Sequence, residues 1–210
     1  MRGMTTGYRC PRCAMKRALC MCALLPQLPT RTQLSIVMHK LEAVKSTNTG
    51  RIAHACLPSS TLHMFGPDLP PLPARPWPHG CTPVVLFPVA GAQPVADFVG
   101  EKQLCVIVLD GSWRQAARMR KRFASQDVPF VTVTRAKPTI YRLRTEPHPG
   151  GVSTLEAVAA ALGVLEGPHV EDALLHALQI FVDRTLYTRG ALAKEAVTGG
   201  IPDGVLPTTL

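Results

Sequence analysis

Acidic and aromatic residues are scarce in this sequence. Only 14 of the 210 residues are Asp or Glu, against 23 Lys or Arg, and Phe, Trp and Tyr together make up 5%. The resulting formal charge of +9 favours partners that carry negative charge, although a solvated basic surface would give the same total. Hydrophobic residues make up 46% and charged residues 18%, which excludes a disordered chain and indicates a folded one.

Long hydrophobic runs are absent as well. No apolar stretch approaches the roughly 20 residues that a membrane-spanning helix needs. Residues 1–3 lead into polar sequence, without the apolar core of a secretory signal peptide. We therefore expect a soluble, cytoplasmic protein with reduced thiols and no membrane partner. Neither a GxGxxG fingerprint nor a P-loop occurs, so nothing indicates a dinucleotide or a nucleoside triphosphate.

Positive charge is concentrated in two blocks. Residues 1–51 hold nine Lys or Arg against Glu42 alone, and residues 114–144 hold nine against Asp127 alone. From residue 145 onward the sign reverses, with eight acids and three bases. Two dense basic blocks separated by neutral sequence favour a nucleic-acid partner over a merely solvated surface.

Four cysteines lie close together near the start of the chain. Cys10 and Cys13 form a Cys-x-x-Cys pair, and Cys20 and Cys22 form a Cys-x-Cys pair. Short spacers of this kind allow four thiolates to surround one tetrahedral zinc ion. A disulfide pair is disfavoured without a secretory signal, and a thioredoxin-like motif would follow a strand. We expect a structural zinc knuckle, and its basic residues favour contact with RNA.

The three remaining cysteines lie apart from one another in apolar stretches. Because they do not share a metal-ligand spacing, we interpret them as packed core thiols. They are Cys56, Cys81 and Cys105.

The central part of the chain predicts a largely parallel sheet covered by helices on both faces. Continuous β-branched runs without alternation are typical of strands that are buried on both sides. The predicted strands span residues 33–38, 61–65, 83–88, 104–109 and 130–133, and the predicted helices span 51–56, 91–99, 112–124, 153–165 and 170–187. Residues 67–83 are rich in proline and predict an irregular connection. The segment after Gly190 predicts a loose tail.

Three loops are expected at the carboxyl ends of the strands, where ligands bind in open α/β sheets. They begin at Leu86, at Asp110 and at Tyr141. Asp110 ends a buried strand and precedes a glycine, so its carboxylate can accept a proton or hold an ammonium group. The alternative is that Asp110 only caps the following helix. Trp113, taken alone, fits packing better than stacking.

Several motifs in a fixed order resemble the DTW-domain family of tRNA-uridine aminocarboxypropyltransferases. The resemblance covers roughly residues 8–190, and the order of the motifs is more specific than any one of them. Where the family is named for Asp-Thr-Trp, this chain has Asp-Gly-Ser-Trp, and serine keeps the hydroxyl. The motifs are the cysteine knuckle, Lys45-x-x-Asn48-Thr49-x-Arg51, Leu86-Phe87-Pro88, Asp110-Gly-Ser-Trp113, Tyr141-x-x-Arg144 and Ser153-Thr154-x-Glu156-Ala157.

The resemblance implies a fold, a reaction and a cofactor. The fold would be related to the SPOUT class, with a knot formed by the C-terminal part. The reaction would transfer the 3-amino-3-carboxypropyl group of S-adenosylmethionine to N3 of a tRNA uridine, releasing methylthioadenosine. By the same resemblance the donor pocket would be lined by Leu86, Phe87, Pro88, Asp110, Gly111, Ser112, Leu143, Arg144, Ser153, Thr154 and Glu156.

Roles can be suggested for some of these side chains. Asp110 is the candidate base for the N3 proton, and Ser112 and Trp113 complete the candidate catalytic group. Arg144 could bind the methionine carboxylate of the donor or a tRNA phosphate. The residues expected to hold the RNA backbone are Lys45, Asn48, Arg51, Arg114, Arg118, Lys121 and Arg122, the last four lying near one helix face.

The sequence thus predicts a zinc segment over residues 1–30, a catalytic domain over residues 31–190 and a tail over residues 191–210. The oligomeric state stays open, with a monomer favoured. Two other functions remain possible on this sequence. One is an RNA methyltransferase of the SPOUT class, which would use the same donor through a different carbon. The other is a zinc-containing RNA-binding protein without catalysis.

Overall fold

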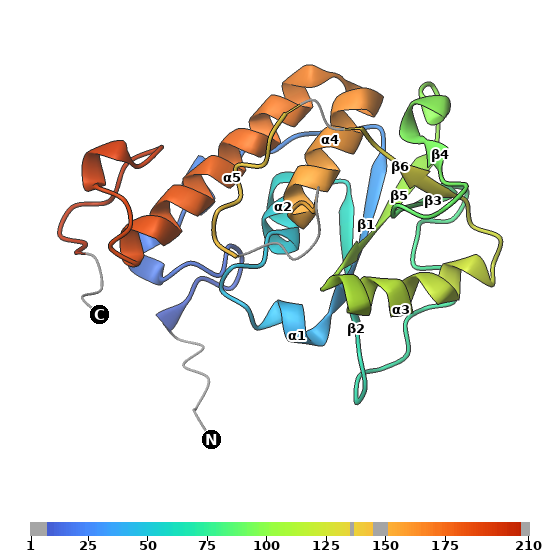
Figure 1. The fold of residues 1–210 in the computed structure, drawn as a ribbon, viewed down its shortest axis with the longest axis horizontal. Coiled ribbons are helices and arrows are strands. Elements are labelled where there is room, and N and C mark those ends of the chain that lie inside the picture. Colours follow the sequence, from blue (N-terminus) through green and yellow to red (C-terminus); the bar gives the residue numbers. More distant parts are fainter. Residues whose placement is uncertain (1–7, 135–136, 145–150, 207–210) are drawn as a thin grey trace.

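A single parallel β-sheet forms the centre of the molecule (Figure 1). The computed structural model describes residues 8–134, 137–144 and 151–206. The strand order is β2-β1-β5-β3-β6-β4, and every neighbouring pair is parallel. The strands are β1 (Gln33–His39), β2 (Ser60–Phe65), β3 (Thr82–Leu86), β4 (Gln93–Pro94), β5 (Leu104–Asp110) and β6 (Phe130–Thr132).

Helices pack on both faces of this sheet, as the sequence predicts. They are α1 (Lys40–Ala43), α2 (Gly50–Cys56), α3 (Trp113–Ala124), α4 (Thr154–Glu166) and α5 (Pro168–Thr188). Short 3-10 helices are η2 (Arg17–Leu19), η3 (Cys22–Leu24), η4 (Val95–Phe98) and η5 (Lys194–Ala196). None of the helices within the described ranges has both the length and the apolar character that crossing a bilayer requires.

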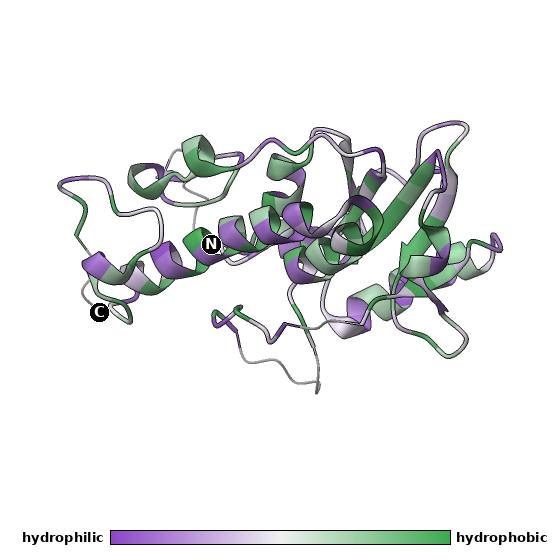
Figure 2. Cartoon of the chain, turned by 90° about the horizontal axis from the view of Figure 1, so that it is seen from above, coloured by the Kyte–Doolittle hydropathy of each residue, from purple (hydrophilic) through white to green (hydrophobic). Residues whose placement is uncertain are grey.

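The hydrophobic core has two parts because helices cover both faces of the sheet. On one face α2, α4 and α5 bury side chains against Ile36 and Val106. On the other face α3 buries Met119 and Phe123 against Val37 and Ile107. Every residue of β5 is buried, in keeping with its apolar sequence up to Asp110. Figure 2 shows the central strands as hydrophobic for most of their length, whereas hydrophobic and hydrophilic residues alternate along the long helices.

Two helix starts are fixed by capping boxes. Ser112 caps α3, accepting from the backbone N–H of Gln115 while the Gln115 side chain accepts from the N–H of Ser112. Ser153 and Glu156 form the same arrangement at α4. The helix that follows Asp110 is therefore capped by Ser112, and Asp110 is left for another role.

The structure departs from the sequence analysis at three points. The helix expected over 91–99 is reduced to β4 and η4, because Pro94 lacks an N–H and Gly91 and Gly100 adopt positive φ. Helix α1 follows β1 without a sequence signal strong enough to predict it. Cys56 and Cys105 are buried core thiols as expected, whereas Cys81 is partly exposed.

The segment after Gly190 was expected to be loose, and its described part, residues 191–206, packs onto α5. Val197 and Ile201 are buried there. The Thr198 hydroxyl and backbone N–H both donate to the carboxylate of Asp183. The side chain of Arg184 donates to the carbonyl of Gly199. These contacts attach the segment to the body of the protein.

Candidate functional site

A cavity of about 1180 Å³ opens at the carboxyl ends of the strands. In a parallel sheet these ends lie along one edge, so the loops that follow β1, β3, β5 and β6 meet there. One part of the cavity wall is apolar and includes Leu86, Phe87, Pro88, Trp113 and Val131. Another part is charged or polar and includes Glu42, Lys45, Asn48, Asp110, Arg144 and Thr154.

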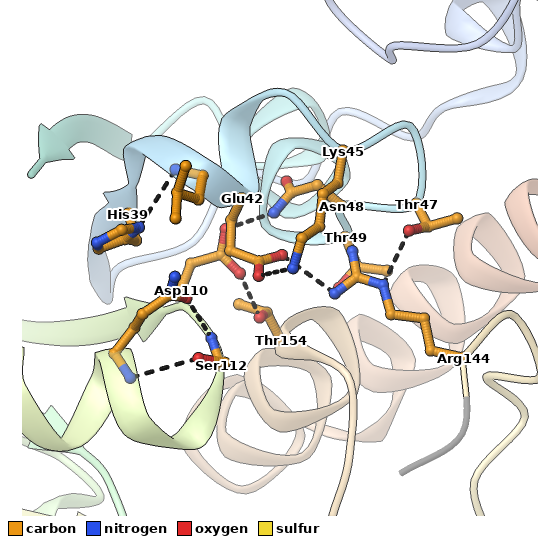
Figure 3. Close-up of polar contacts among 12 residues, drawn as sticks. His39, Glu42, Lys45, Thr47, Asn48, Thr49, Asp110, Ser112, Arg144 and Thr154 are labelled. Atoms are coloured by element: carbon orange, nitrogen blue, oxygen red, sulfur yellow. Dashed lines mark hydrogen bonds and ion pairs between the residues drawn. The ribbon is translucent and has the colours of Figure 1, made fainter.

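Asp110 lies at the end of β5 and is only 3% exposed. One carboxylate oxygen accepts a hydrogen bond from Asn48 Nδ2 at 2.6 Å, and the other accepts one from Thr154 Oγ1 at 2.6 Å (Figure 3). Burial raises the pKa of this carboxyl above its ordinary value, while the bonds from Thr154 and Asn48 oppose the rise. A carboxylate of raised pKa held by two neutral donors is suited to accept a proton.

A glycine makes this close arrangement possible. Gly50, at the start of α2, lies so near Asp110 that a Cβ there would stand 2.7 Å from its Oδ2 atom. Because real Cβ atoms essentially never approach so closely, a larger residue would displace the carboxylate. The N-terminal turn of α2, the end of β5 and the start of α4 therefore meet at Asp110.

The aromatic residues belong to the apolar part of the cavity wall. The rings of Phe87 and Trp113 are 5.8 Å apart and tilted by 60°. The guanidinium of Arg120 lies 5.9 Å from the Phe87 ring. Ser112, whose oxygen caps α3, lines the cavity beside them. This side offers an apolar surface for a flat ring.

Most of the residues predicted for the donor pocket come together in this cavity. Nine of the eleven predicted residues line it: Leu86, Phe87, Pro88, Asp110, Gly111, Ser112, Arg144, Ser153 and Thr154. Residues 145–150, within the long loop after Tyr141, lie outside the described residues.

Leu143 and Glu156 are buried and do not line the cavity. The Leu143 carbonyl accepts from Arg189 Nη1 at 3.1 Å. The Glu156 carboxylate accepts from the Thr139 hydroxyl at 2.8 Å and from the Ile140 N–H at 3.0 Å, besides capping α4. Their contacts position the wall of the cavity from behind.

The residues predicted to hold RNA fall into two groups. Lys45, Asn48 and Arg114 line the cavity, and Arg118 and Lys121 are exposed farther along α3. By contrast, two arginines donate to backbone carbonyls. Arg122 contacts the carbonyls of residues 72 and 73, and Arg51 contacts those of residues 11 and 43.

Arg144 is contacted by two residues of the cavity wall to which the sequence analysis assigned no role. Glu42 and Thr47 both contact Arg144, at 3.1 Å and 2.8 Å. Glu42 stood out in the sequence only as the single acid of residues 1–51. Its place directly after β1, whose carboxyl end lies beside that of β5, was the signal that could have found it.

The four N-terminal cysteines form a candidate metal centre. The four sulfur atoms lie within 4.8 Å of one another, with 3.6 Å between Cys10 and Cys22 and 3.8 Å between Cys13 and Cys20. A tetrahedral ion with bonds of about 2.3 Å to sulfur requires sulfur atoms about 3.8 Å apart. The cluster therefore fits zinc in number, chemistry and spacing.

Comparisons with known proteins identify a family and several relatives. Residues 7–186 match the family described as DTW domain. A protein named tRNA-uridine aminocarboxypropyltransferase 2 from Macaca fascicularis is 28% identical, over 81% of this chain and 61% of its own length. One named tRNA-uridine aminocarboxypropyltransferase A from Arabidopsis thaliana is also 28% identical, over 82% of this chain and 79% of its own.

The chain thus spans about 61% of the length of the macaque relative. The mouse protein of the same name gives the same coverage. No solved structure matches. Because the family match extends over most of the sequence, including the cysteine cluster and all strands and helices through α4, the chain belongs to the DTW domain family.

Proposed function

We propose that this protein transfers the 3-amino-3-carboxypropyl group of S-adenosylmethionine to N3 of a uridine in tRNA and releases methylthioadenosine. The proposal is supported by the names of the relatives, which describe tRNA-uridine aminocarboxypropyl transfer. The observation that carries it is the cavity at the strand ends, whose lining combines a group of apolar residues with a group of charged and polar ones. A donor with a flat nucleoside at one end and an amino acid at the other matches this division.

The donor would be held by residues of both walls. Leu86, Phe87 and Pro88 offer apolar contact for the nucleoside, and Arg144 offers a guanidinium for the carboxylate. Ser153 and Thr154 lie at the N-terminus of α4, close to Asp110. The sulfonium of the donor supplies an activated leaving group, so the protein has to orient the reactants rather than activate the donor.

The transfer balances without another reactant. A bond forms between uridine N3 and the γ-carbon of the aminocarboxypropyl group, and the bond from that carbon to sulfur breaks. Its electron pair stays on sulfur, which becomes a neutral thioether. The N3 proton must leave, and Asp110 is our candidate acceptor because its pKa is raised by burial and its position is fixed by Asn48 and Thr154.

The acceptor would be a uridine that is unpaired or extruded, because N3 is hidden in a base pair. The exposed cations of α3, Arg114, Arg118 and Lys121, lie next to the cavity and would contact RNA phosphates. A SPOUT-related knot, a monomeric state and a cytoplasmic location are part of the same proposal. The cytoplasm is consistent with zinc-binding thiolates, which reducing conditions protect.

Mass spectrometry of nucleosides tests the proposal. Unmodified tRNA is incubated with S-adenosylmethionine and either the wild type or the Asp110→Asn variant. We expect the wild type to yield a uridine heavier by one aminocarboxypropyl group and the variant to yield at most about one hundredth of that product. A methyl-sized increase would identify a methyltransferase instead. Binding of tRNA with no modified nucleoside would favour a non-catalytic RNA-binding protein.

A further inference from the structure

Glu42 is a buried acid in a wall that is otherwise rich in cations. Its side chain is 4% exposed, and its two carboxylate oxygens contact Lys45 and Arg144 separately. The Arg144 Nη1 atom is 3.1 Å from Glu42 Oε2, and the Arg144 Nε atom donates to Thr47 Oγ1 at 2.8 Å. Figure 3 shows Glu42, Lys45 and Arg144 converging from α1, the loop after it and the segment that follows Tyr141.

The two cations of this cluster remain open to the cavity. The side chain of Lys45 is 42% exposed and that of Arg144 is 35% exposed, and both line the cavity with Glu42. Two positive charges therefore share one carboxylate. A guanidinium has five N–H donors, and the contacts to Glu42 and Thr47 use two of them. The cluster has the charge and the donors to accept a further carboxylate.

Stability alone is a poor explanation for this cluster. Removing a carboxylate from water costs free energy that its ion pairs barely repay, so a buried pair adds little net stability. The position of Glu42 in a ligand-sized cavity points to binding instead.

We propose that Glu42 and Arg144 together bind the amino-acid end of the donor, Glu42 contacting its α-ammonium and Arg144, with Lys45, its α-carboxylate. This inference rests on the proposed function and deepens it. An α-amino acid carries both charges on one carbon, so a carboxylate and a guanidinium that already touch each other can bind both groups side by side. The remaining lone pairs of the Glu42 oxygens accept the ammonium without losing the two cations.

Asp110, which also lines the cavity, is less suited to this task. Its two oxygens are held by the neutral side chains of Asn48 and Thr154, and burial raises its pKa, which favours the uncharged form. Glu42, by contrast, forms ion pairs with two cations, Lys45 and Arg144. In this proposal Asp110 accepts the N3 proton of the uridine, and Glu42 binds the α-ammonium of the donor.

Calorimetric binding of a ligand series tests the inference without following the reaction. The ligands are S-adenosylmethionine, its analogue with a hydroxyl in place of the α-ammonium, its decarboxylated form, and methylthioadenosine, which lacks the amino-acid end. For the wild type we expect each lost charged group to weaken binding about 10- to 100-fold. Equal affinities for all four ligands would overturn the inference, and this comparison needs no variant.

Binding to variants then shows which residue contacts each charged group of the ligand. We expect Glu42→Gln to weaken S-adenosylmethionine binding about 10-fold or more while leaving methylthioadenosine and the hydroxyl analogue nearly unchanged. Arg144→Gln should remove the preference over the decarboxylated form. Glu195→Gln, an exposed acid of η5, is the matched control and should change nothing.

Two results with Glu42→Gln would contradict the inference. Equal weakening of the hydroxyl analogue would mean that Glu42 acts only by positioning Arg144. Loss of methylthioadenosine binding would mean that Glu42 maintains the shape of the cavity. The proposed function fails separately: if the expected pattern of affinities is found but no aminocarboxypropyl group reaches tRNA, the donor site stands and the reaction is a different one.

Discussion

At the scale of single residues, Asp110 connects the most parts of the site. Its carboxylate accepts hydrogen bonds from Asn48, in the turn before α2, and from Thr154, at the start of α4. It also lies against the backbone at Gly50. Its side chain is buried with a raised pKa, an arrangement that costs stability at neutral pH in exchange for a fixed carboxylate. Two predictions concern this residue and its neighbour.

The first prediction concerns the pH dependence of stability. Because the pKa of Asp110 is higher in the folded than in the unfolded state, the folded protein binds more protons above the unfolded value. Its contribution is therefore most favourable below the unfolded pKa and is lost as pH rises through the folded pKa. Asp110→Asn, which cannot ionise, should gain stability relative to the wild type on going from about pH 4 to about pH 7.

Urea unfolding of both proteins at the two pH values measures this change. The rotatable Thr154 hydroxyl can accept from the new amide while the amide oxygen accepts from Asn48, so the variant keeps its hydrogen bonds. A difference in unfolding free energy that is the same at both pH values would show that Asp110 has no raised pKa.

The second prediction concerns Gly50. Gly50→Ala would place a Cβ 2.7 Å from the Oδ2 atom of a carboxylate that cannot retreat, because Asn48 and Thr154 hold it. We expect a loss of about 1–3 kcal/mol in unfolding free energy and a strong loss of transfer. The double variant Gly50→Ala, Asp110→Ala removes the clash. Its cost should be less than the sum of the two single variants, and additive costs would exclude the clash as the cause.

At the scale of elements, helix α3 has a buried apolar face and an exposed face that carries positive charge. Met119 and Phe123 face the sheet, while Arg114, Arg118 and Lys121 are exposed. The capping box at Ser112 fixes the start of the helix next to the cavity. The exposed cations therefore continue the cavity wall outward along one helix.

The third prediction tests this face. Replacing Arg114, Arg118 and Lys121 by alanine should weaken tRNA binding. The slope of the logarithm of the binding constant against the logarithm of the salt concentration should become shallower by about 0.7–0.9 for each lost phosphate contact. Lys194→Ala, in η5 near the opposite end of the molecule from α3 (Figure 1), should leave both unchanged. An unaltered salt dependence in the triple variant would place the RNA elsewhere. Filter binding at several salt concentrations provides the measurement.

Some features of these elements could be predicted from the sequence and others could not. The strand β5 is a continuous apolar run up to Asp110, and β1 is apolar between its polar ends except at Ser35, so two strands of a largely parallel sheet could be predicted here. Arg51 and Arg122 could not be separated from the phosphate-binding candidates, because backbone carbonyls that accept from an arginine leave no trace in sequence. Glu42 was missed for a similar reason, since its partner Arg144 is 102 residues away.

At the scale of the whole molecule, the segment that holds the cysteine cluster contacts both α5 and the turn before α2. Arg184 of α5 donates to the carbonyls of Leu19 and Cys20 and to that of Gly199 in the C-terminal segment. Arg51, which follows the Asn48 turn, donates to the carbonyl of Pro11 between two of the cysteines. Hydrogen bonds thus link the cluster to the turn that holds Asp110.

The fourth prediction follows from these contacts. We expect one zinc ion per chain, and its removal by a chelator should lower the unfolding temperature and weaken S-adenosylmethionine binding. Cys13→Ser should have the same effects, whereas Cys81→Ser, outside the cluster, should keep the ion and the affinity. Elemental analysis with thermal unfolding checks the prediction. A metal-free protein with unchanged stability would exclude a structural zinc site.

The central claim is that the aminocarboxypropyl group, and not the methyl group, leaves the donor. The most direct measurement uses two samples of S-adenosylmethionine, one labelled at the carboxyl carbon and one at the methyl carbon, each incubated with unmodified tRNA and the wild-type protein. We predict that the carboxyl label enters tRNA while the methyl label appears in methylthioadenosine. Methyl label in tRNA, or tRNA without either label, would contradict the account.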